Sequence, residues 1–268
     1  MSSPKTICFL VGAPRSGTTW IQRLLQTHPA ICGGEESHFF TLFAHPMQAA
    51  DRMLSRNSDR KIGPLVYTDR DTYENAIREI WGRIFVGLYS ENPGACVHLE
   101  KTPDHSLYLE EITRLFPDAK IIFLTRDSRA VTASLINAGK GWGSHWAPDN
   151  VRDAAIVWRR YIEAIRGWHT RNPSHPFLTI RYEDALANTE AMLDQMLDFV
   201  LPKGTPHETQ KILKLFATMQ EERKDPAGFA RLRGKGGWRN DLSLRQKVTV
   251  WRYTRRSMRA LGYEIGPI

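Results

Sequence analysis

A glycine-bounded loop near the amino terminus has the composition of a phosphate-binding site. The apolar residues 7–11 lead into Gly-Ala-Pro-Arg-Ser-Gly-Thr-Thr-Trp, residues 12–20. A strand that turns tightly into a helix here would gather backbone N–H groups and the positive end of a helix dipole, which together bind phosphate. Nucleotide-hydrolysing loops of the pattern G-x-x-x-x-G-K-[ST] carry a lysine where this chain has Thr18. The loop therefore predicts a phosphate ligand and argues against ATP or GTP hydrolysis.

Arg15 places a permanently charged fork of donors inside this loop. A guanidinium binds an oxyanion through two parallel hydrogen bonds, so Arg15 is a candidate anion ligand. A second candidate pair is Arg126, at the end of another apolar run, and Ser134, eight residues later. These two side chains would lie together if the helix that follows the strand folds back over the strand's tip.

The loop resembles the 5′-phosphosulfate loop of sulfotransferases that use 3′-phosphoadenosine-5′-phosphosulfate (PAPS). That donor has one sulfated 5′-phosphate and no outer phosphates. The resemblance implies that the donor is bound by a set of loop residues: Arg15, Ser16, Gly17, Thr18, Thr19 and Trp20, the last by stacking on adenine. It also implies that Arg126 and Ser134 bind the donor's 3′-phosphate, and that Tyr182 of the Tyr-Glu-Asp segment approaches the nucleotide.

A later segment, residues 229–240, partly matches the Arg-Lys-Gly and Gly-Asp-Trp-Lys-Asn motifs of cytosolic sulfotransferases. Arg231 fits the first arginine, but Leu232 and Arg233 stand where lysine and glycine would be. The resemblance implies that Arg231 and Arg233 help to bind the donor. It leaves open which of Arg231, Arg233 and Lys235 holds the 3′-phosphate.

The resemblance also implies the catalytic residues. Cytosolic sulfotransferases use the histidine of a Lys-Thr-His triplet as base, but this chain has Lys101-Thr102-Pro103. Residues 28–37 are instead similar to tyrosylprotein sulfotransferases, whose catalytic glutamate falls on Glu36. A carboxylate can act as a base when its surroundings lift its pKa toward the working pH. Lys101 matches a lysine that faces the bridging oxygen, and Glu100 is the second choice for the base.

The implied reaction is direct in-line transfer. Glu36 deprotonates an acceptor hydroxyl, while Arg15 and Lys101 stabilise the departing 3′,5′-adenosine bisphosphate (PAP), and no metal is needed. Two alternatives remain, a nucleotide or small-molecule kinase and a catalytically inactive nucleotide-binding protein. The acceptor stays open among small-molecule, peptidyl, glycan and lipid-linked hydroxyls, as does the oligomeric state. An aromatic-lined mouth is expected from four residues: Phe39, Phe40, Trp142 and Trp146.

These side chains need a scaffold that brings strand ends together. Apolar, β-like runs occur at Thr6–Val11, Lys120–Thr125 and Pro176–Arg181, with a weaker one at Ala95–Leu99. Helix-like segments alternate with them at 17–27, 37–54, 72–90, 106–115, 128–138, 150–171, 184–200, 207–220 and 243–261. This alternation predicts an α/β, P-loop-type fold whose mostly parallel sheet has helices on both faces. Without a clear linker, one domain over residues 1–268 is expected.

Composition limits the partners. The net charge of +8 favours an anionic ligand, and the spread of the basic residues disfavours nucleic acid. Three cysteines are too few for a disulfide framework. The apolar runs are too short for a membrane span or a secretory signal, so a cytoplasmic protein without a membrane span is expected.

Overall fold

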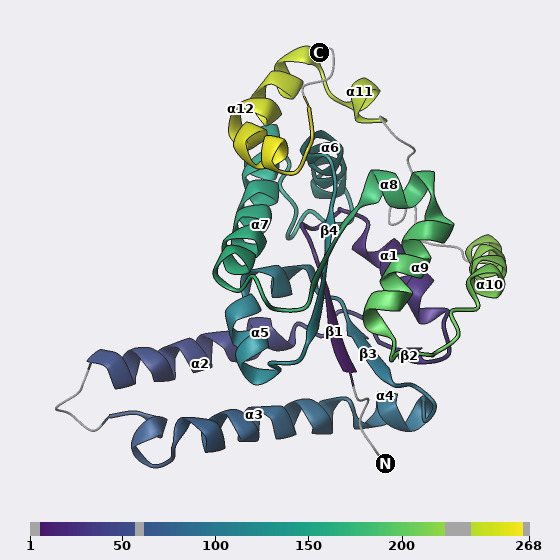
Figure 1. Cartoon of the computed structure of the whole chain (residues 1–268). Helices are drawn as coiled ribbons and strands as arrows, with labels where there is room; N and C mark the ends of the chain where they lie inside the picture. The colour runs from purple at the N-terminus through teal and green to yellow at the C-terminus, as the bar shows by residue number, and fades with distance from the viewer. Residues whose placement is uncertain (1–5, 57–61, 223–236, 265–268) are drawn as a thin grey trace.

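A five-stranded parallel sheet forms the centre of the computed structural model, which describes residues 6–56, 62–222 and 237–264 (Figure 1). The strand order is β2-β3-β1-β4-β5, and every pairing is parallel. The strands are β1 (Thr6–Val11), β2 (Ile31–Cys32), β3 (Val97–Glu100), β4 (Lys120–Thr125) and β5 (Phe177–Arg181). The predicted α/β class with a mostly parallel sheet is confirmed.

The inner residues of the central strands β1 and β4, 7–11 and 121–124, are apolar because helices cover both faces of the sheet. Cys8, Phe9, Leu10 and Val11 of β1 are all fully buried. Phe9 and Val11 pack into one hydrophobic cluster, and Cys8 and Leu10 pack into another. Alternate side chains of one strand thus enter two separate cores, one on each side of the sheet.

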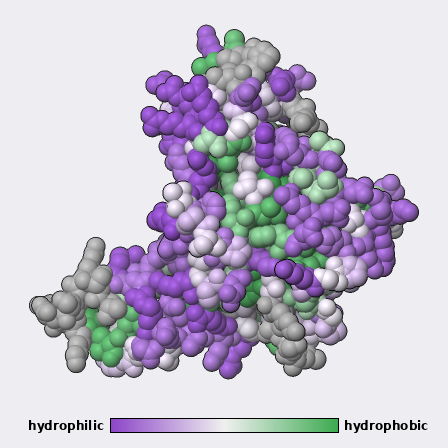
Figure 2. All heavy atoms as spheres, in the orientation of Figure 1, coloured by the Kyte–Doolittle hydropathy of each residue, from purple (hydrophilic) through white to green (hydrophobic). Residues whose placement is uncertain are grey.

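Two groups of helices supply these cores. Helices α1 (Thr18–Gln26), α8 (Tyr182–Ala187), α9 (Thr189–Val200) and α10 (Thr209–Glu222) cover one face. The other face is covered by α2 (Phe39–Arg56), α3 (Arg70–Ile84), α5 (Leu109–Leu115), α6 (Ser128–Gly139), α7 (Val151–Arg171) and α12 (Leu244–Ala260). The remaining short elements are α4 (Val86–Glu91), α11 (Trp238–Asp241) and the 3-10 turns η1 (Pro64–Val66) and η2 (Pro103–Leu107). Figure 2 shows apolar residues along the middle of one face, between hydrophilic residues on either side.

Three predicted helices are each two elements. The segment 72–90 divides at Phe85 into α3 and α4, and 106–115 divides into η2 and α5. The segment 184–200 divides at Asn188, whose side chain accepts a hydrogen bond from the backbone N–H of Ala191 at 3.2 Å and caps α9. Asparagine favours such caps over helix interiors because its side chain competes for backbone groups. The two-residue strand β2 and the four-residue helix α11 were not predicted.

The carboxyl ends of the strands gather the candidate side chains at one edge of the sheet. Strand β1 lies between β3 and β4 and leads into the phosphate loop. Lys101, Arg126 and Tyr182 are the first residues after β3, β4 and β5. Ligands of open parallel sheets bind at this edge, where connections from neighbouring strands diverge. The fold therefore brings together residues up to 167 positions apart (15 to 182 in the printed numbering).

Candidate active site

A cavity of about 1510 Å³ opens at the carboxyl edge of the sheet. Pockets for one small ligand typically measure about 300 to 1,000 Å³, so this cavity has room for two. Most of the predicted site residues line it: Arg15, Gly17, Thr18, Thr19, Trp20, Glu36, Lys101, Arg126, Ser134 and Tyr182. Four chain segments and the loop after β1 thus contribute to one site.

The phosphate loop needs glycine at its last turn. Gly17 has φ of 99°, and a Cβ there would lie 2.4 Å from Cε2 of Tyr182. Arg15 also has a positive φ, 69°, which is uncommon for a residue with a side chain. Helix α1 begins directly after Gly17, at Thr18, so its free backbone N–H groups face the loop. This is the backbone geometry that the sequence predicted for anion binding.

Ser16 is placed differently from its neighbours. Its side chain is fully buried and does not line the cavity. Within the described part of the chain, the Ser16 hydroxyl has no hydrogen-bond partner. Its backbone N–H donates to the carbonyl of Ala13 at 3.1 Å, which closes the turn. Ser16 is therefore positioned to shape the loop.

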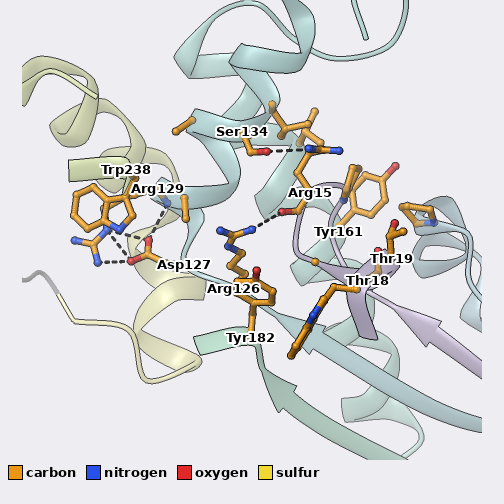
Figure 3. Close-up of a pocket in the computed structure, with 18 of the residues that line it drawn as sticks. Arg15, Thr18, Thr19, Arg126, Asp127, Arg129, Ser134, Tyr161, Tyr182 and Trp238 are labelled. Atoms are coloured by element: carbon orange, nitrogen blue, oxygen red, sulfur yellow. Dashed lines mark hydrogen bonds and ion pairs between the residues drawn. The ribbon is translucent and has the colours of Figure 1, made fainter. Parts of the chain in front are cut away.

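Two arginines converge on this loop (Figure 3). Arg15 Nε donates to Ser134 Oγ at 3.1 Å, and Arg126 Nη1 donates to the Arg15 carbonyl at 3.3 Å. Burial, together with the neighbouring Arg126, lowers the pKa of Arg15, although a guanidinium stays charged at neutral pH. In the described residues, the buried Nε of Arg126 has no hydrogen-bond partner. This arrangement suits an anion with more than one charged group.

Tyr182 supports both the loop and Arg126. Its ring is 3% exposed, and the Arg126 guanidinium lies 4.2 Å from the ring centroid. Trp20 contacts the same ring edge to face, at 5.9 Å between centroids, and it contacts Phe216 at 6.4 Å. Trp20 is only partly buried and lines the cavity, so its ring is available to a planar ligand.

Glu36 and Lys101 form an ion pair at the cavity wall through Oε1 and Nζ. The lysine side chain is 3% exposed and also donates to Thr19 Oγ1 at 3.4 Å. The Glu36 side chain is 36% exposed, and its second oxygen lies 3.7 Å from His38 Nε2. Glu36 is therefore a carboxylate exposed to the cavity, and the lysine that pairs with it also contacts the phosphate loop.

Glu100, the second candidate for the base, is 1% exposed and does not line the cavity. Its Oε1 accepts hydrogen bonds from Ser37 Oγ and Thr102 Oγ1, each at 2.9 Å. Burial raises the pKa of Glu100. A base must reach the hydroxyl that it deprotonates, so this geometry favours Glu36 for that role.

Other residues that line the cavity were not predicted from the sequence. Asp127 caps α6 by accepting from the backbone N–H of Arg129 at 2.8 Å, and it also binds the Arg129 guanidinium. That guanidinium lies 4.1 Å from the Trp238 ring centroid (Figure 3). The Asp127-Ser128 step is a helix-start signal, so this cap could have been found. The hydrogen bond from Tyr161 to Asp104 joins two elements and has no local signal.

Two of the four residues predicted to form an aromatic mouth line the cavity. Trp142 and Trp146 line the cavity, are 42% and 41% exposed, and lie 5.6 Å apart between ring centroids. Phe39 and Phe40 do not line it, because they begin α2 and pack in the core, where they are 2% and 0% exposed. The expectation that they contribute to the mouth was wrong.

Three predicted donor ligands, Arg231, Arg233 and Lys235, lie outside the described residues. Among the described residues, no group of three or more His, Cys, Asp or Glu side chains could hold a metal ion. None of the described helices has the length and apolarity required to cross a bilayer.

One protein is similar to this chain in sequence, and two solved structures are similar to it in fold. Human protein-tyrosine sulfotransferase 1 is 32% identical over 161 residues, which are 59% of this chain and 41% of the human protein. A crystal structure of a sulfotransferase from Mycobacterium avium matches with a TM-score of 0.60 and 17% identity, over 98% of this chain and 78% of the other. A mouse sulfotransferase complexed with PAP matches with a TM-score of 0.60 and 15% identity, over 97% and 86%. These two structures support the fold.

The family assignment comes from a match to the profile described as the sulfotransferase family, which extends over residues 8–201. This range includes the phosphate loop, Glu36, Lys101, Arg126, Ser134 and Tyr182. The chain belongs to the sulfotransferase family.

Proposed function

We propose that this protein transfers the sulfuryl group of PAPS to an acceptor hydroxyl. The observation that carries the proposal is the convergence of Arg15, Arg126 and Ser134 on a phosphate loop that opens into the same cavity as the Glu36–Lys101 ion pair. The cavity thus brings a candidate anion site and a candidate base together. The family supports sulfuryl transfer, and the PAP bound to the mouse neighbour supports the choice of donor.

In this proposal, the loop residues 15–19 bind the 5′-phosphosulfate through backbone N–H groups, the Thr18 and Thr19 hydroxyls and the Arg15 guanidinium. Arg126 and Ser134 bind the 3′-phosphate, and Trp20 and Tyr182 contact the nucleoside. Arg231 and Arg233 are proposed as further ligands. Hydrogen bonds between charged groups are stronger than those between neutral groups. Donors that are already fixed inside the cavity need little reorganisation when the charged ligand binds.

For the chemical step, we propose that Glu36 takes the proton of the acceptor hydroxyl. The new bond forms between the acceptor oxygen and sulfur, while the bond between sulfur and the bridging oxygen of the donor breaks. Arg15 and Lys101 balance the negative charge that develops on that oxygen as PAP departs. Fixed cations of this kind stabilise a transition state in which charge moves to the leaving group.

The acceptor is proposed only as a hydroxyl compound. The similarity to human protein-tyrosine sulfotransferase 1 covers less than half of that protein, so a peptidyl tyrosine is one class among several. Trp142 and Trp146 form the aromatic wall that an acceptor would meet. Small-molecule, peptidyl, glycan and lipid-linked hydroxyls therefore all belong in the test.

The experiment offers four acceptors to the purified protein: p-nitrophenol, a tyrosine peptide flanked by acidic residues, a glycan oligosaccharide and a hydroxylated lipid. Each is incubated with PAPS in EDTA, and mass spectrometry follows the gain of one sulfuryl group. The same panel with ATP and Mg²⁺ tests the kinase alternative through the gain of a phosphoryl group. A sulfated product with PAPS supports the proposal, whereas a phosphorylated product with ATP overturns it.

A further inference from the structure

The segment that carries Glu36, residues 33–38, has no regular secondary structure, but it is fixed at both ends. At its start, Gln22 Nε2 on helix α1 donates to the Gly34 carbonyl at 2.7 Å. Gly33 passes so close to strand β3 that a Cβ there would lie 2.4 Å from the Leu99 carbonyl oxygen. At its end, Ser37 Oγ donates to Glu100 Oε1 at 2.9 Å. The segment is therefore held against the phosphate-loop helix and the end of β3.

Glu100 connects the two catalytic candidates through their chain neighbours. Ser37 directly follows Glu36, and Thr102 directly follows Lys101. Both hydroxyls donate to the same atom, Glu100 Oε1, at 2.9 Å. One buried oxygen thus sets the spacing between the segment with the base and the segment with the lysine.

Further contacts make this junction rigid. The backbone N–H of His38 donates to Thr102 Oγ1 at 3.3 Å, and the backbone N–H of Phe40 bonds to His105 Nε2 at 3.3 Å. His105 Nδ1 lies 3.6 Å from Glu100 Oε1. Both Glu100 and His105 are 1% exposed, so their side chains are shielded from solvent, whereas Ser37 is partly buried. A buried polar network with good geometry specifies one arrangement of its members.

We propose that Glu100 is a positioning residue, which holds Glu36 and Lys101 in register by accepting the hydrogen bonds of Ser37 and Thr102. The inference rests on the proposed function, because it assumes that Glu36 is the base. It assigns Glu100 no contact with either substrate. A group that orients a catalytic residue is worth about 10- to 100-fold in activity, and a displacement of about 1 Å has a similar cost.

The test compares Glu100→Ala, Glu100→Gln and Ser37→Ala with the wild-type protein. The rate of PAP release from PAPS, with water as the probe acceptor, reports sulfuryl transfer, and calorimetry with PAP reports donor binding. Glu100→Ala should lower the rate about 10- to 100-fold while the Kd for PAP changes less than about threefold. Ser37→Ala should lower the rate about 10-fold. The double variant, Glu100→Ala with Ser37→Ala, should lower the rate by less than the product of the two single-variant factors.

The conservative variant separates positioning from proton transfer. The amide oxygen in Glu100→Gln can still accept from both hydroxyls, so this variant should keep its rate within about fivefold of wild type. An amide cannot act as a base, so Glu100→Gln would instead lose about 100- to 10,000-fold in rate if Glu100 were the base.

Glu111 provides a matched control, because it is a buried carboxylate, 8% exposed, whose Oε1 accepts from Gln48 Nε2 at 2.8 Å away from the cavity. Glu111→Ala should lower the melting temperature and leave the rate unchanged. Equal rates for Glu100→Ala, Ser37→Ala and wild type would overturn the inference, as would inactive Glu100→Gln. The proposed function would be contradicted independently of this inference if the wild-type protein neither bound PAP nor released PAP from PAPS.

Discussion

The carboxylate of Glu36 and the ammonium of Lys101 form an ion pair although they lie 65 positions apart in the chain. The lysine follows strand β3 and is 3% exposed, whereas the glutamate is 36% exposed at the cavity wall. A buried, fixed cation therefore lies between the candidate base and the phosphate loop, where it also contacts Thr19. In the proposed reaction, the same lysine holds the base before transfer and balances the leaving group during it.

Replacement of this carboxylate tests the base. Glu36→Gln should lower the rate of sulfuryl transfer about 100- to 10,000-fold, because an amide cannot accept the acceptor's proton. The Kd for PAP should stay within about threefold of wild type, since Glu36 is not proposed to touch the nucleotide. Glu35→Gln is the matched control, because Glu35 is the adjacent exposed carboxylate. If both variants retained wild-type rates, the proton would have another acceptor.

The role of Arg126 is tested by comparing two nucleotides. PAP and AMP differ by the 3′-phosphate, which we assign to Arg126 and Ser134. A hydrogen bond to a charged group contributes about 1.5 to 3 kcal/mol, so Arg126→Ala should weaken the binding of PAP about 10- to 100-fold. The binding of AMP should weaken much less, and calorimetry would measure both affinities directly. Arg171→Ala, at an exposed arginine paired with Glu110, serves as the control. Equal weakening of PAP and AMP would contradict the 3′-phosphate assignment.

Gly17 should be essential to the shape of the loop. Alanine there adopts a left-handed conformation, which costs about 1 to 2 kcal/mol, and its Cβ would overlap the Tyr182 ring. Gly17→Ala should therefore lower the free energy of unfolding, measured in urea, by more than about 2 kcal/mol, and it should weaken the binding of PAP. Gly82→Ala is the control, since its Cβ would meet nothing within 4 Å. Its position inside helix α3 predicts a gain of about 0.5 to 1 kcal/mol.

Two buried histidines predict acid sensitivity. Burial lowers the pKa of His98 to about 4 and that of His105 to about 3, whereas both titrate near 6.5 when unfolded. Between these values the unfolded chain binds more protons than the folded one, so stability rises with pH. The free energy of unfolding should therefore fall from pH 6.5 to pH 4, on the order of a few kcal/mol. Urea titrations should show a shallower pH dependence in His98→Asn, and an unchanged slope would contradict this assignment.

Much of the fold was predictable because its signals are local. The runs that became β1 and β4 are apolar over residues 7–11 and 121–124, as is typical of strands covered on both faces. The loop at residues 12–20 and Arg126 follow these two runs, whereas Tyr182 was expected from the family resemblance. The two-residue strand β2 has too few residues to leave a pattern, and the helix break at Asn188 depends on one capping bond.

The contacts that complete the site could not be predicted in this way. The bonds of Glu100 to Ser37 and Thr102 and of Tyr161 to Asp104 join segments that only the tertiary fold brings together. Glu100 carries the residue type of a base, and burial alone distinguishes it from Glu36. Phe39 and Phe40 likewise resemble mouth residues in sequence, but the start of α2 turns them into the core.

We propose that the loop, Arg126 and Ser134 form a site for a nucleotide with one 5′-phosphate and one 3′-phosphate. Calorimetric titration of the wild-type protein with PAP in EDTA, beside ATP with Mg²⁺, tests it most directly. We expect saturable binding of one PAP per chain without metal, at least about 10-fold tighter than that of ATP. Tighter binding of ATP with Mg²⁺, or no binding of PAP, would contradict it.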